Sequence, residues 1–325
     1  MKFALLVLVT IASAGIFYQV AVPSPRLTFG TAADDQVLLA RFSLDSKTVI
    51  SSQKKKGLQL WNVSDGSLIR QFKSANERPT QEIRTVSFSA DGKTLIASGQ
   101  DRDLVFWDIA TGKELRASPG DNKETFFLHS MTPDDSQILT VDSNSNIKRW
   151  DAQTGKLLKE CKVRRTAPYP NTMEFAKDGR NFLLVDAHEV FVCDLETLEV
   201  RFNYDKGDHK PLRYIGIGGA KMAPDAAGII FCNREGKVVD LDFATGMERR
   251  TLDLKSSGIR AIRLNAKGDR LLAGCADGVV RFFSYPECKL LKTISGYIDA
   301  QISPDGKTAL TFTKNGRMML WDLDK

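Results

Sequence analysis

Short apolar stretches recur along the chain, and polar turns of two kinds separate them. In residues 86–113 an Asp-Gly turn is followed by the apolar stretch Thr94–Ala97. A polar loop, an alternating stretch ending in Trp107-Asp108 and a Thr-Gly turn come next. Apolar and β-branched residues bounded by such turns favour strands, and Asp-Gly suits a tight hairpin because it tolerates positive φ. The pattern predicts four short antiparallel strands per unit.

The unit occurs seven times. The centres of its first turn, among them Asp91, Asp178 and Asp305, are 38 to 47 residues apart, and a large apolar residue lies three positions before each. All four tryptophans share one position of the unit: Trp61, Trp107, Trp150 and Trp321. The other three units have Cys193, Leu241 and Phe283 there. A four-stranded sheet with two apolar faces cannot bury both alone, so the units should stack radially as a propeller.

This repeat resembles that of the WD-repeat β-propeller family. The resemblance rests on the repeated turn and on Trp61-Asn62, Trp107-Asp108, Trp150-Asp151 and Trp321-Asp322, and it covers roughly residues 26–325. It implies an all-β, seven-bladed propeller of four-stranded antiparallel blades. The seventh unit ends after its third strand. The resemblance therefore implies that Arg26–Phe29 closes the ring by pairing with Arg317–Trp321.

The chain departs from that family in its histidines. It has only His129, His188 and His209, and no Gly-His pair. The buried Asp-His-Ser/Thr-Trp hydrogen-bond chain of the family is therefore expected to be absent. Apolar packing should then hold the blades, with buried polar groups satisfied in the backbone ladders.

The first 22 residues differ from the rest of the chain. After one lysine, Phe3 to Val22 is almost entirely apolar. It fits either a signal peptide with small residues at Ala12-Ser13-Ala14 or an uncleaved anchor of spanning length. Both alternatives predict export. Residues 1–22 would be the signal or anchor, and residues 23–325 a single propeller that is periplasmic, extracellular or tethered outside the cytoplasm.

Composition narrows the partner class only slightly. The net charge of +6 and the sequence pI near 9.0 allow an acidic partner but do not favour nucleic acid. The membrane is expected to be contacted only through the N-terminal segment. Five cysteines without a C-x-x-C motif are too few for a disulfide scaffold, and we interpret them as small buried hydrophobic residues.

Motifs for catalysis or cofactors are weak. Gly216-Ile217-Gly218 lacks the third glycine and the strand–helix context of a dinucleotide site. Asp142–Asn146 begins like a calcium loop but lacks the later ligands, which favours a solvated turn. The Thr-Gly-Lys turns at 111–113 and 154–156 resemble those of quinone propellers, but the tryptophan precedes the turn instead of following it. The sequence predicts no catalytic residue, cofactor or metal.

One group of loops is a candidate for partner binding. The loops within and between units should lie on the face opposite the Asp-Gly and Thr-Gly turns, and several of them are basic. The candidate residues are Lys54, Lys55, Lys56, Lys162, Arg164, Arg165, Tyr169, His209, Lys210 and Arg213. They would suit an acidic protein or an anionic polymer. The alternative is that these loops are ordinary solvated surface.

Two functions remain open at this point. The first is a non-catalytic protein-interaction scaffold, exported or membrane-tethered, that binds an unidentified protein partner through its loops. The second is a small-ligand-binding protein, or a hydrolase or lactonase-like enzyme, that uses the central channel. Clustered carboxylates or histidines in the channel would favour the second, and a mixed lining would favour the first.

Overall fold

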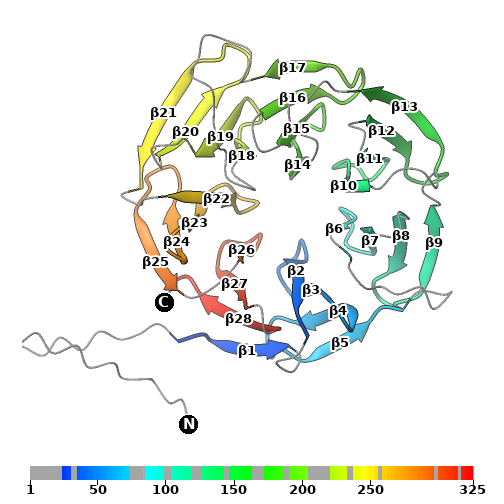
Figure 1. The fold of residues 1–325 in the computed structure, drawn as a ribbon, viewed down its shortest axis with the longest axis vertical. Helices are drawn as coiled ribbons and strands as arrows, with labels where there is room; N and C mark the ends of the chain where they lie inside the picture. Colours follow the sequence, from blue (N-terminus) through cyan, green and yellow to red (C-terminus); the bar gives the residue numbers. More distant parts are fainter. Residues whose placement is uncertain are drawn as a thin grey trace, which may run out of the picture.

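The described part of the chain forms a ring of seven sheets. The computed structural model describes residues 24–30, 35–73, 83, 85–98, 104–118, 126–142, 146–162, 172–185, 190–203, 220–232, 237–254, 258–295, 299–313 and 316–324. These residues form twenty-eight strands in seven four-stranded antiparallel sheets around a central axis (Figure 1). The predicted seven-bladed, all-β propeller is confirmed.

Each sheet is one blade, and its first strand is the innermost. Blade 1 contains β2 (Val37–Phe42), β3 (Thr48–Gln53), β4 (Gly57–Asn62) and β5 (Leu68–Gln71). Blade 2 contains β6 (Thr85–Phe88), β7 (Thr94–Ser98), β8 (Leu104–Asp108) and β9 (Glu114–Ser118). Blade 3 contains β10 (Phe126–Met131), β11 (Gln137–Asp142), β12 (Asn146–Asp151) and β13 (Leu157–Lys162).

The remaining blades follow the same order, except that the last is completed by the N-terminal strand. Blade 4 contains β14 (Thr172–Phe175), β15 (Asn181–Val185), β16 (Val190–Asp194) and β17 (Val200–Asn203). Blade 5 contains β18 (Ala220–Met222), β19 (Gly228–Cys232), β20 (Lys237–Asp242) and β21 (Glu248–Asp253). Blade 6 contains β22 (Ile259–Leu264), β23 (Arg270–Cys275), β24 (Val279–Ser284) and β25 (Leu290–Ser295). Blade 7 contains β26 (Asp299–Ile302), β27 (Thr308–Phe312), β28 (Arg317–Asp322) and β1 (Leu27–Gly30).

The predicted ring closure is confirmed. Strand β1 pairs antiparallel with β28, with Leu27 opposite Leu320 and Gly30 opposite Arg317. The first and the last strand in the chain, β1 and β28, thus lie side by side in one blade (Figure 1). Closure removes the exposed edge that β28 would otherwise present.

Apolar packing between neighbouring blades forms the core. The buried hydrophobic residues divide into seven clusters, and each cluster joins the facing sides of two adjacent blades. One example joins Ile50 and Leu58 of blade 1 to Trp107 of blade 2. This arrangement confirms that each sheet buries its two faces against its neighbours, as the repeat predicts.

The predicted turns have the expected backbone conformation. All seven first turns place a residue with positive φ after the central residue, and in three of them that residue is not glycine: Ser46, Asp135 and Ala226. The aspartates at the centre brace these turns. Asp91 accepts hydrogen bonds from the Ser89 hydroxyl (2.6 Å) and the Lys93 amide (2.9 Å), and these bonds lower the pKa of its carboxyl.

Asp178 and Asp305 act in the same way as Asp91. Asp178 accepts from the Arg180 amide at 2.9 Å, and Asp305 accepts from the Ser303 hydroxyl at 2.6 Å. A side-chain acceptor two residues before a backbone N–H is typical of an Asx turn. These aspartates therefore stabilise the backbone of the first turns.

The tryptophan position corrects one expectation. Trp61, Trp107 and Trp321 are buried, and Trp150 is partly buried. In three blades the indole Nε1 donates to a hydroxyl on the adjacent strand at 2.9 Å: Trp61 to Ser51, Trp150 to Thr140 and Trp321 to Thr311. The Trp–Ser/Thr part of the family's hydrogen-bond chain is therefore retained, although the Gly-His pair is absent. Backbone ladders are not the only means of satisfying these buried polar groups.

A second repeated contact, which the sequence analysis did not predict, connects neighbouring blades. Outer-strand cations donate to backbone carbonyls in a turn of the next blade. The pairs are Arg70 with Thr111, Arg116 with Gln153, Lys159 with Glu196 and Lys292 with Asp322. Across the closure, Arg26 donates to the Val63 carbonyl. The positive charges thus bind carbonyls in turns or at strand ends, and among the described residues they connect blades 1 and 2, 2 and 3, 3 and 4, 6 and 7, and 7 and 1.

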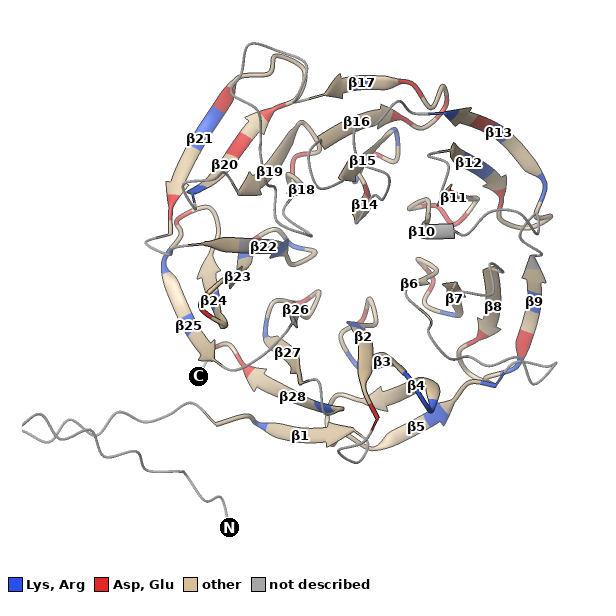
Figure 2. Ribbon diagram, in the orientation of Figure 1, with Lys and Arg blue, Asp and Glu red and all other residues tan. Residues whose placement is uncertain are grey.

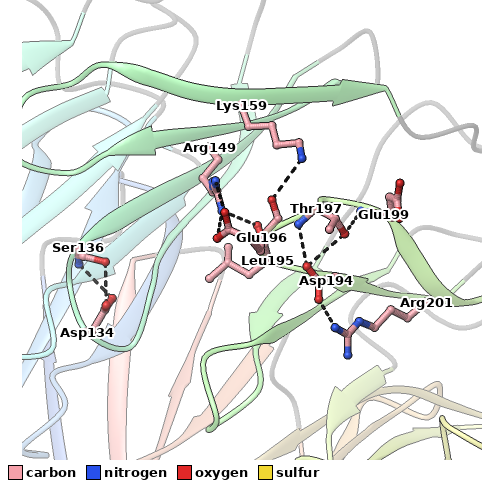
Figure 3. Close-up of polar contacts among 10 residues, drawn as sticks. All are labelled: Asp134, Ser136, Arg149, Lys159, Asp194, Leu195, Glu196, Thr197, Glu199 and Arg201. Carbon is pink, nitrogen blue, oxygen red and sulfur yellow. Dashed lines mark hydrogen bonds and ion pairs between the residues drawn. The ribbon is translucent and has the colours of Figure 1, made fainter.

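The contact between blades 3 and 4 shows this arrangement in detail. Lys159 reaches the Glu196 carbonyl at 3.4 Å, and Arg149 binds the Glu196 carboxylate at 2.8 Å and the Leu195 carbonyl at 3.0 Å (Figure 3). In the same turn, Asp194 accepts from the Thr197 amide at 2.7 Å (Figure 3). The turn is therefore held both by its own blade and by its neighbour.

The cysteines and the N-terminal segment are two further features for which the sequence makes predictions. The five cysteines form no disulfide bonds with one another. Cys193, Cys232 and Cys275 are buried, which confirms their interpretation as small core residues, and Cys161 and Cys288 are partly buried. The proposed export segment, residues 1–22, lies outside the described residues. No helix among the residues that the structure describes is long and apolar enough to cross a membrane.

Candidate functional site

A cavity of about 380 Å³ lies at the inner ends of the blades. Residues of six of the seven innermost strands line it: β2, β6, β10, β14, β18 and β22. These strands surround the axis of the ring (Figure 1). Leu44, in the turn after β2, extends the cavity to the face that carries the Asp-Gly-type turns. The lining is mixed, with apolar, hydroxyl and charged side chains.

One position of the repeat supplies most of the polar lining. It is the residue immediately before the large apolar residue of each innermost strand. In chain order it is occupied by Arg41, Ser87, Ser130, Glu174, Lys221, Arg263 and Gln301. Five of the seven line the cavity directly, and Glu174 contacts it through Lys221. Because the seven units form a ring, the residues at this one position of the repeat form a polar layer around the axis.

Three cations converge in this layer. Lys221 Nζ lies 3.2 Å from Glu174 Oε2, and Arg263 Nε donates to the Ala300 carbonyl at 3.2 Å. Burial lowers the pKa of Lys221; Glu174 opposes that shift, and the positive charges of Arg263 and Arg41 add to it. Arg41 and Arg263 are therefore near enough to repel Lys221. Arg41, Lys221 and Arg263 line the cavity, and Glu174 pairs with Lys221 beside it.

His129 is the single histidine among the described residues, and it borders the cavity. Its side chain is buried, with Nδ1 3.1 Å from the Ser98 hydroxyl and Nε2 3.3 Å from the Ile96 carbonyl. Burial, assisted by the charge of Arg41, lowers the pKa of His129 to about 4. The imidazole is consequently neutral at pH 7 and links blade 3 to blade 2.

The acid dependence of stability should reflect this histidine. Its pKa is about 4 in the fold against an ordinary value of 6.5, so between these values the unfolded chain binds the extra proton. The contribution of His129 is present above pH 6.5 and is lost as the pH falls toward 4. The loss reaches about 1.4 kcal/mol per pH unit. Denaturant titrations over this pH range measure the slope.

The His129→Gln variant provides the control. His188 and His209 remain in it, so the difference between the two slopes isolates His129. We expect a flatter dependence in the variant. Equal slopes in both proteins would show that His129 titrates normally in the fold.

The structure places four of the ten predicted loop residues. Lys54, Lys55 and Lys56 form the exposed turn between β3 and β4, and Lys162 is exposed at the end of β13. The lysine turn belongs to blade 1 and Lys162 to blade 3, with blade 2 between them (Figure 1). Arg164, Arg165, Tyr169, His209, Lys210 and Arg213 lie outside the described residues. Lys and Arg are distributed around the whole ring (Figure 2).

The lysine turn is held in a defined position. The Lys55 amide donates to the carboxylate of buried Asp35 at 2.7 Å, and the Gln71 side chain donates to the Lys56 carbonyl at 2.8 Å. The Lys54 amide also donates to the Gln36 carbonyl at 2.9 Å. Its backbone is therefore fixed while its three ammonium groups remain exposed.

Asp142, the first residue of the predicted solvated turn at 142–146, differs from that prediction, and residues 143–145 lie outside the described residues. Asp142 is completely buried instead of solvated. Its carboxylate accepts from the Asn146 amide and side chain, both at 2.9 Å, and lies 3.8 Å from Lys148 Nζ. A buried carboxylate needs such partners because desolvation penalises its charge. No group of three or more His, Cys, Asp or Glu in the described part of the chain is arranged to hold a metal ion.

The axial cations Arg41, Lys221 and Arg263 were not among the candidates predicted from the sequence. Their signal was a repeated position next to the apolar residue that marks each innermost strand, and three of its seven occupants are basic. The loop cations were recognised because several of them are adjacent in the chain. The axial cations are far apart in the chain, because they belong to blades 1, 5 and 6. An alignment of the seven units would have placed the three axial cations at one position of the repeat.

Comparisons with known proteins agree with this fold. The profile of the WD domain, G-beta repeat, matches residues 246–284, and a profile described as outer membrane protein assembly factor BamB matches residues 18–161. The chain is 23% identical over 150 residues to a serine-threonine kinase receptor-associated protein of Gallus gallus. That match covers 46% of this chain and 40% of the relative, so the chain matches less than half of the relative's length.

The two profile matches fall in different parts of the chain. Together with the seven four-stranded blades and the buried tryptophan position, they identify the chain as a WD-repeat β-propeller. Proteins of this class have a scaffold fold, which is consistent with protein interaction.

Proposed function

We propose that this protein is a non-catalytic interaction scaffold, exported or tethered to a membrane by its N-terminal segment, that binds a protein partner through the loops of one face. The observation that carries the proposal is the exposed lysine turn fixed on a closed ring. The alternative is a small-ligand-binding protein or a hydrolase that uses the central channel. Of these alternatives, the cationic cavity favours ligand binding.

The ring supports this role because it is a rigid frame. Blade-to-blade packing and the β1–β28 closure hold the strands of the ring in place, and the described turns that join these strands are held with them. Binding residues are found disproportionately on loops that a rigid scaffold positions, since a preformed surface loses little conformational entropy on binding. A partner could contact several blades at once.

The lysine turn supports an acidic partner. Three consecutive exposed ammonium groups create a local positive potential, which accelerates association with a negatively charged surface. The backbone under them is fixed by Asp35 and Gln71. The names attached to the comparisons, an assembly factor and a receptor-associated protein, describe proteins that associate with others and are compatible with this reading.

Capture of binding partners from native cells tests the scaffold proposal. Tagged full-length protein is purified after cross-linking, and co-purifying proteins are quantified for the wild type and for a variant with Lys54, Lys55 and Lys56 changed to Glu. We expect a partner that the wild type captures and the variant loses. Fractionation of the same cells locates the complex, and recovery in the cytoplasm would contradict export.

The matched control changes three exposed lysines on the opposite face: Lys113, Lys156 and Lys289 to Glu. This variant has the same charge and has lost the same number of lysines available to the cross-linker. It should retain the partner. Equal capture by all three proteins would remove the lysine turn from the interface, and absence of any specific partner would contradict the scaffold itself.

A further inference from the structure

We propose that the rim of the ring at Leu68 and Ile69 lies against the lipid surface to which the N-terminal segment tethers the protein, with the lysine turn directed away from that surface. This inference rests on the proposed tether and deepens it, because it names the part of the ring that meets the membrane. That part is the outer edge of blades 7 and 1, at the end of the blades that carries the Asp-Gly and Thr-Gly-type turns.

The short linker between the apolar N-terminal stretch and the ring is the first argument. The apolar stretch ends at Val22, and β1 begins at Leu27, so only residues 23–26 separate the two. That linker spans at most about 17 Å even when it is fully extended. An apolar stretch inserted in a bilayer would therefore hold the start of β1 close to the lipid headgroups.

The direction of β1 determines which end of the blades is held there. Leu27 pairs with Leu320, near the end of β28. The Arg26 guanidinium donates to the Val63 carbonyl at 3.2 Å, directly after the end of β4. The lysine turn precedes β4, so it lies at the opposite end of blade 1. The tether and the lysine turn are thus at opposite ends of the blades.

Exposed apolar side chains beside the start of β1 are the second argument. Leu68 and Ile69 begin β5 directly after the turn that contains Gly66, and they are 47% and 45% exposed. This turn packs closely on β1, since a Cβ added to Gly66 would lie 3.0 Å from the Leu27 side chain. Large apolar side chains gain free energy when a contact removes their surface from water. The tether therefore brings a bilayer to an apolar part of the rim.

The charges around these apolar side chains include both signs. Lys47 and Asp65 are both exposed, and the Val63 amide donates to the Lys47 carbonyl at 2.9 Å in the same turn region. On β1's side, Arg26 pairs with Asp322 at 3.3 Å. Contact with lipid at this rim would therefore depend on apolar burial and not on an excess of one charge. A zwitterionic lipid surface is the matching partner.

Blade 3 provides a matched control surface. Leu157 and Leu158 occupy the repeat positions in β13 that Leu68 and Ile69 occupy in β5, and they are 41% and 42% exposed. Strand β13 lies across the ring from β1 (Figure 1). The two pairs are thus alike in chemistry and differ in their distance from the tether.

Photocross-linking to lipid tests this orientation. In the full-length protein, Ile69, Leu158 and Lys55 are replaced one at a time by the photoreactive residue p-benzoylphenylalanine. Each variant is reconstituted in phosphatidylcholine vesicles and irradiated, and its lipid adducts are quantified by mass spectrometry. We expect several-fold more adduct at position 69 than at position 158 or 55, because only the first position lies beside the tether.

Two further measurements make the comparison specific. Flotation of the vesicles in a density gradient reports whether the protein is tethered at all. Thermal melting of each variant reports whether the ring is folded, and all three replaced side chains are exposed, so the ring should tolerate the changes.

Two results would overturn the orientation alone. One is equal adduct formation at positions 69 and 158 in protein that floats with the vesicles. The other is adduct formation mainly at position 55, which would turn the lysine turn toward the bilayer. Protein that does not float would instead contradict the tether on which the inference rests. Partner capture through the lysine turn is measured separately and can succeed or fail independently of these results.

Discussion

Truncation of Trp107 to alanine should lower the free energy of unfolding by about 3–5 kcal/mol. The side chain is 1% exposed and packs between blades 1 and 2, in a cluster with Ile50 and Leu58. Its ring also meets Phe72 edge-on, with centroids 6.2 Å apart. The substitution would leave a cavity at a blade boundary that two sheets enclose. Urea denaturation followed by circular dichroism measures the loss.

Leu115→Ala provides the matched control for Trp107. Leu115 belongs to β9, which pairs with the strand that carries Trp107, but its side chain is 58% exposed. Its truncation should change stability by less than about 0.5 kcal/mol. If Trp107→Ala costs under 1 kcal/mol, the tryptophan position is not part of the core and the repeat has been assigned the wrong phase.

Deletion of residues 24–30 should destabilise the ring more than any single truncation in that strand. The deletion removes β1 and exposes the edge of β28, where Met318 and Leu320 are completely buried in the intact ring. It also removes Phe29, whose ring meets Trp61 of blade 1 at 5.6 Å between centroids. The contact between blades 7 and 1 thereby loses the side chains of β1, although Leu310 and Phe312 of β27 still pack in the same cluster as blade 1. Thermal melting and limited proteolysis report the opening.

Two single substitutions in β1 provide stability changes with which the effect of the deletion is compared. Phe29→Ala should cost about 3–5 kcal/mol because the side chain is buried in the cluster that joins blades 7 and 1. Thr28→Ala should be nearly neutral because Thr28 is exposed on the same strand. An unchanged melting temperature after the deletion would refute closure by β1.

The turns show how far local sequence alone predicts this structure. Asp-Gly and Thr-Gly pairs mark hairpins, and the units with other residues adopt the same positive φ at Ser46, Asp135 and Ala226. The repeat therefore predicts backbone conformation where the individual residues do not favour it, because the surrounding strands enforce the hairpin. Non-glycine residues in this region carry a steric cost that only the packed blade can offset.

The errors arose where a side chain depends on a partner distant in the chain. The absence of Gly-His pairs suggested that the tryptophans had no polar partner, but Ser51, Thr140 and Thr311 accept the indole hydrogen bonds. Asp142 was expected to be solvated, yet it is buried with Lys148. A motif search finds known combinations of residues, whereas hydrogen bonds require only geometry and a free acceptor.

The amino-acid sequence by itself determined the number of blades, the strands and turns of each blade, and the closing strand. These features are periodic or local, so apolar spacing and turn residues specify them directly. Only the tertiary structure decided which charges meet at the axis. Arg41, Lys221 and Arg263 are far apart in the chain, and they converge because radial stacking brings the same position of every unit to the centre of the closed ring.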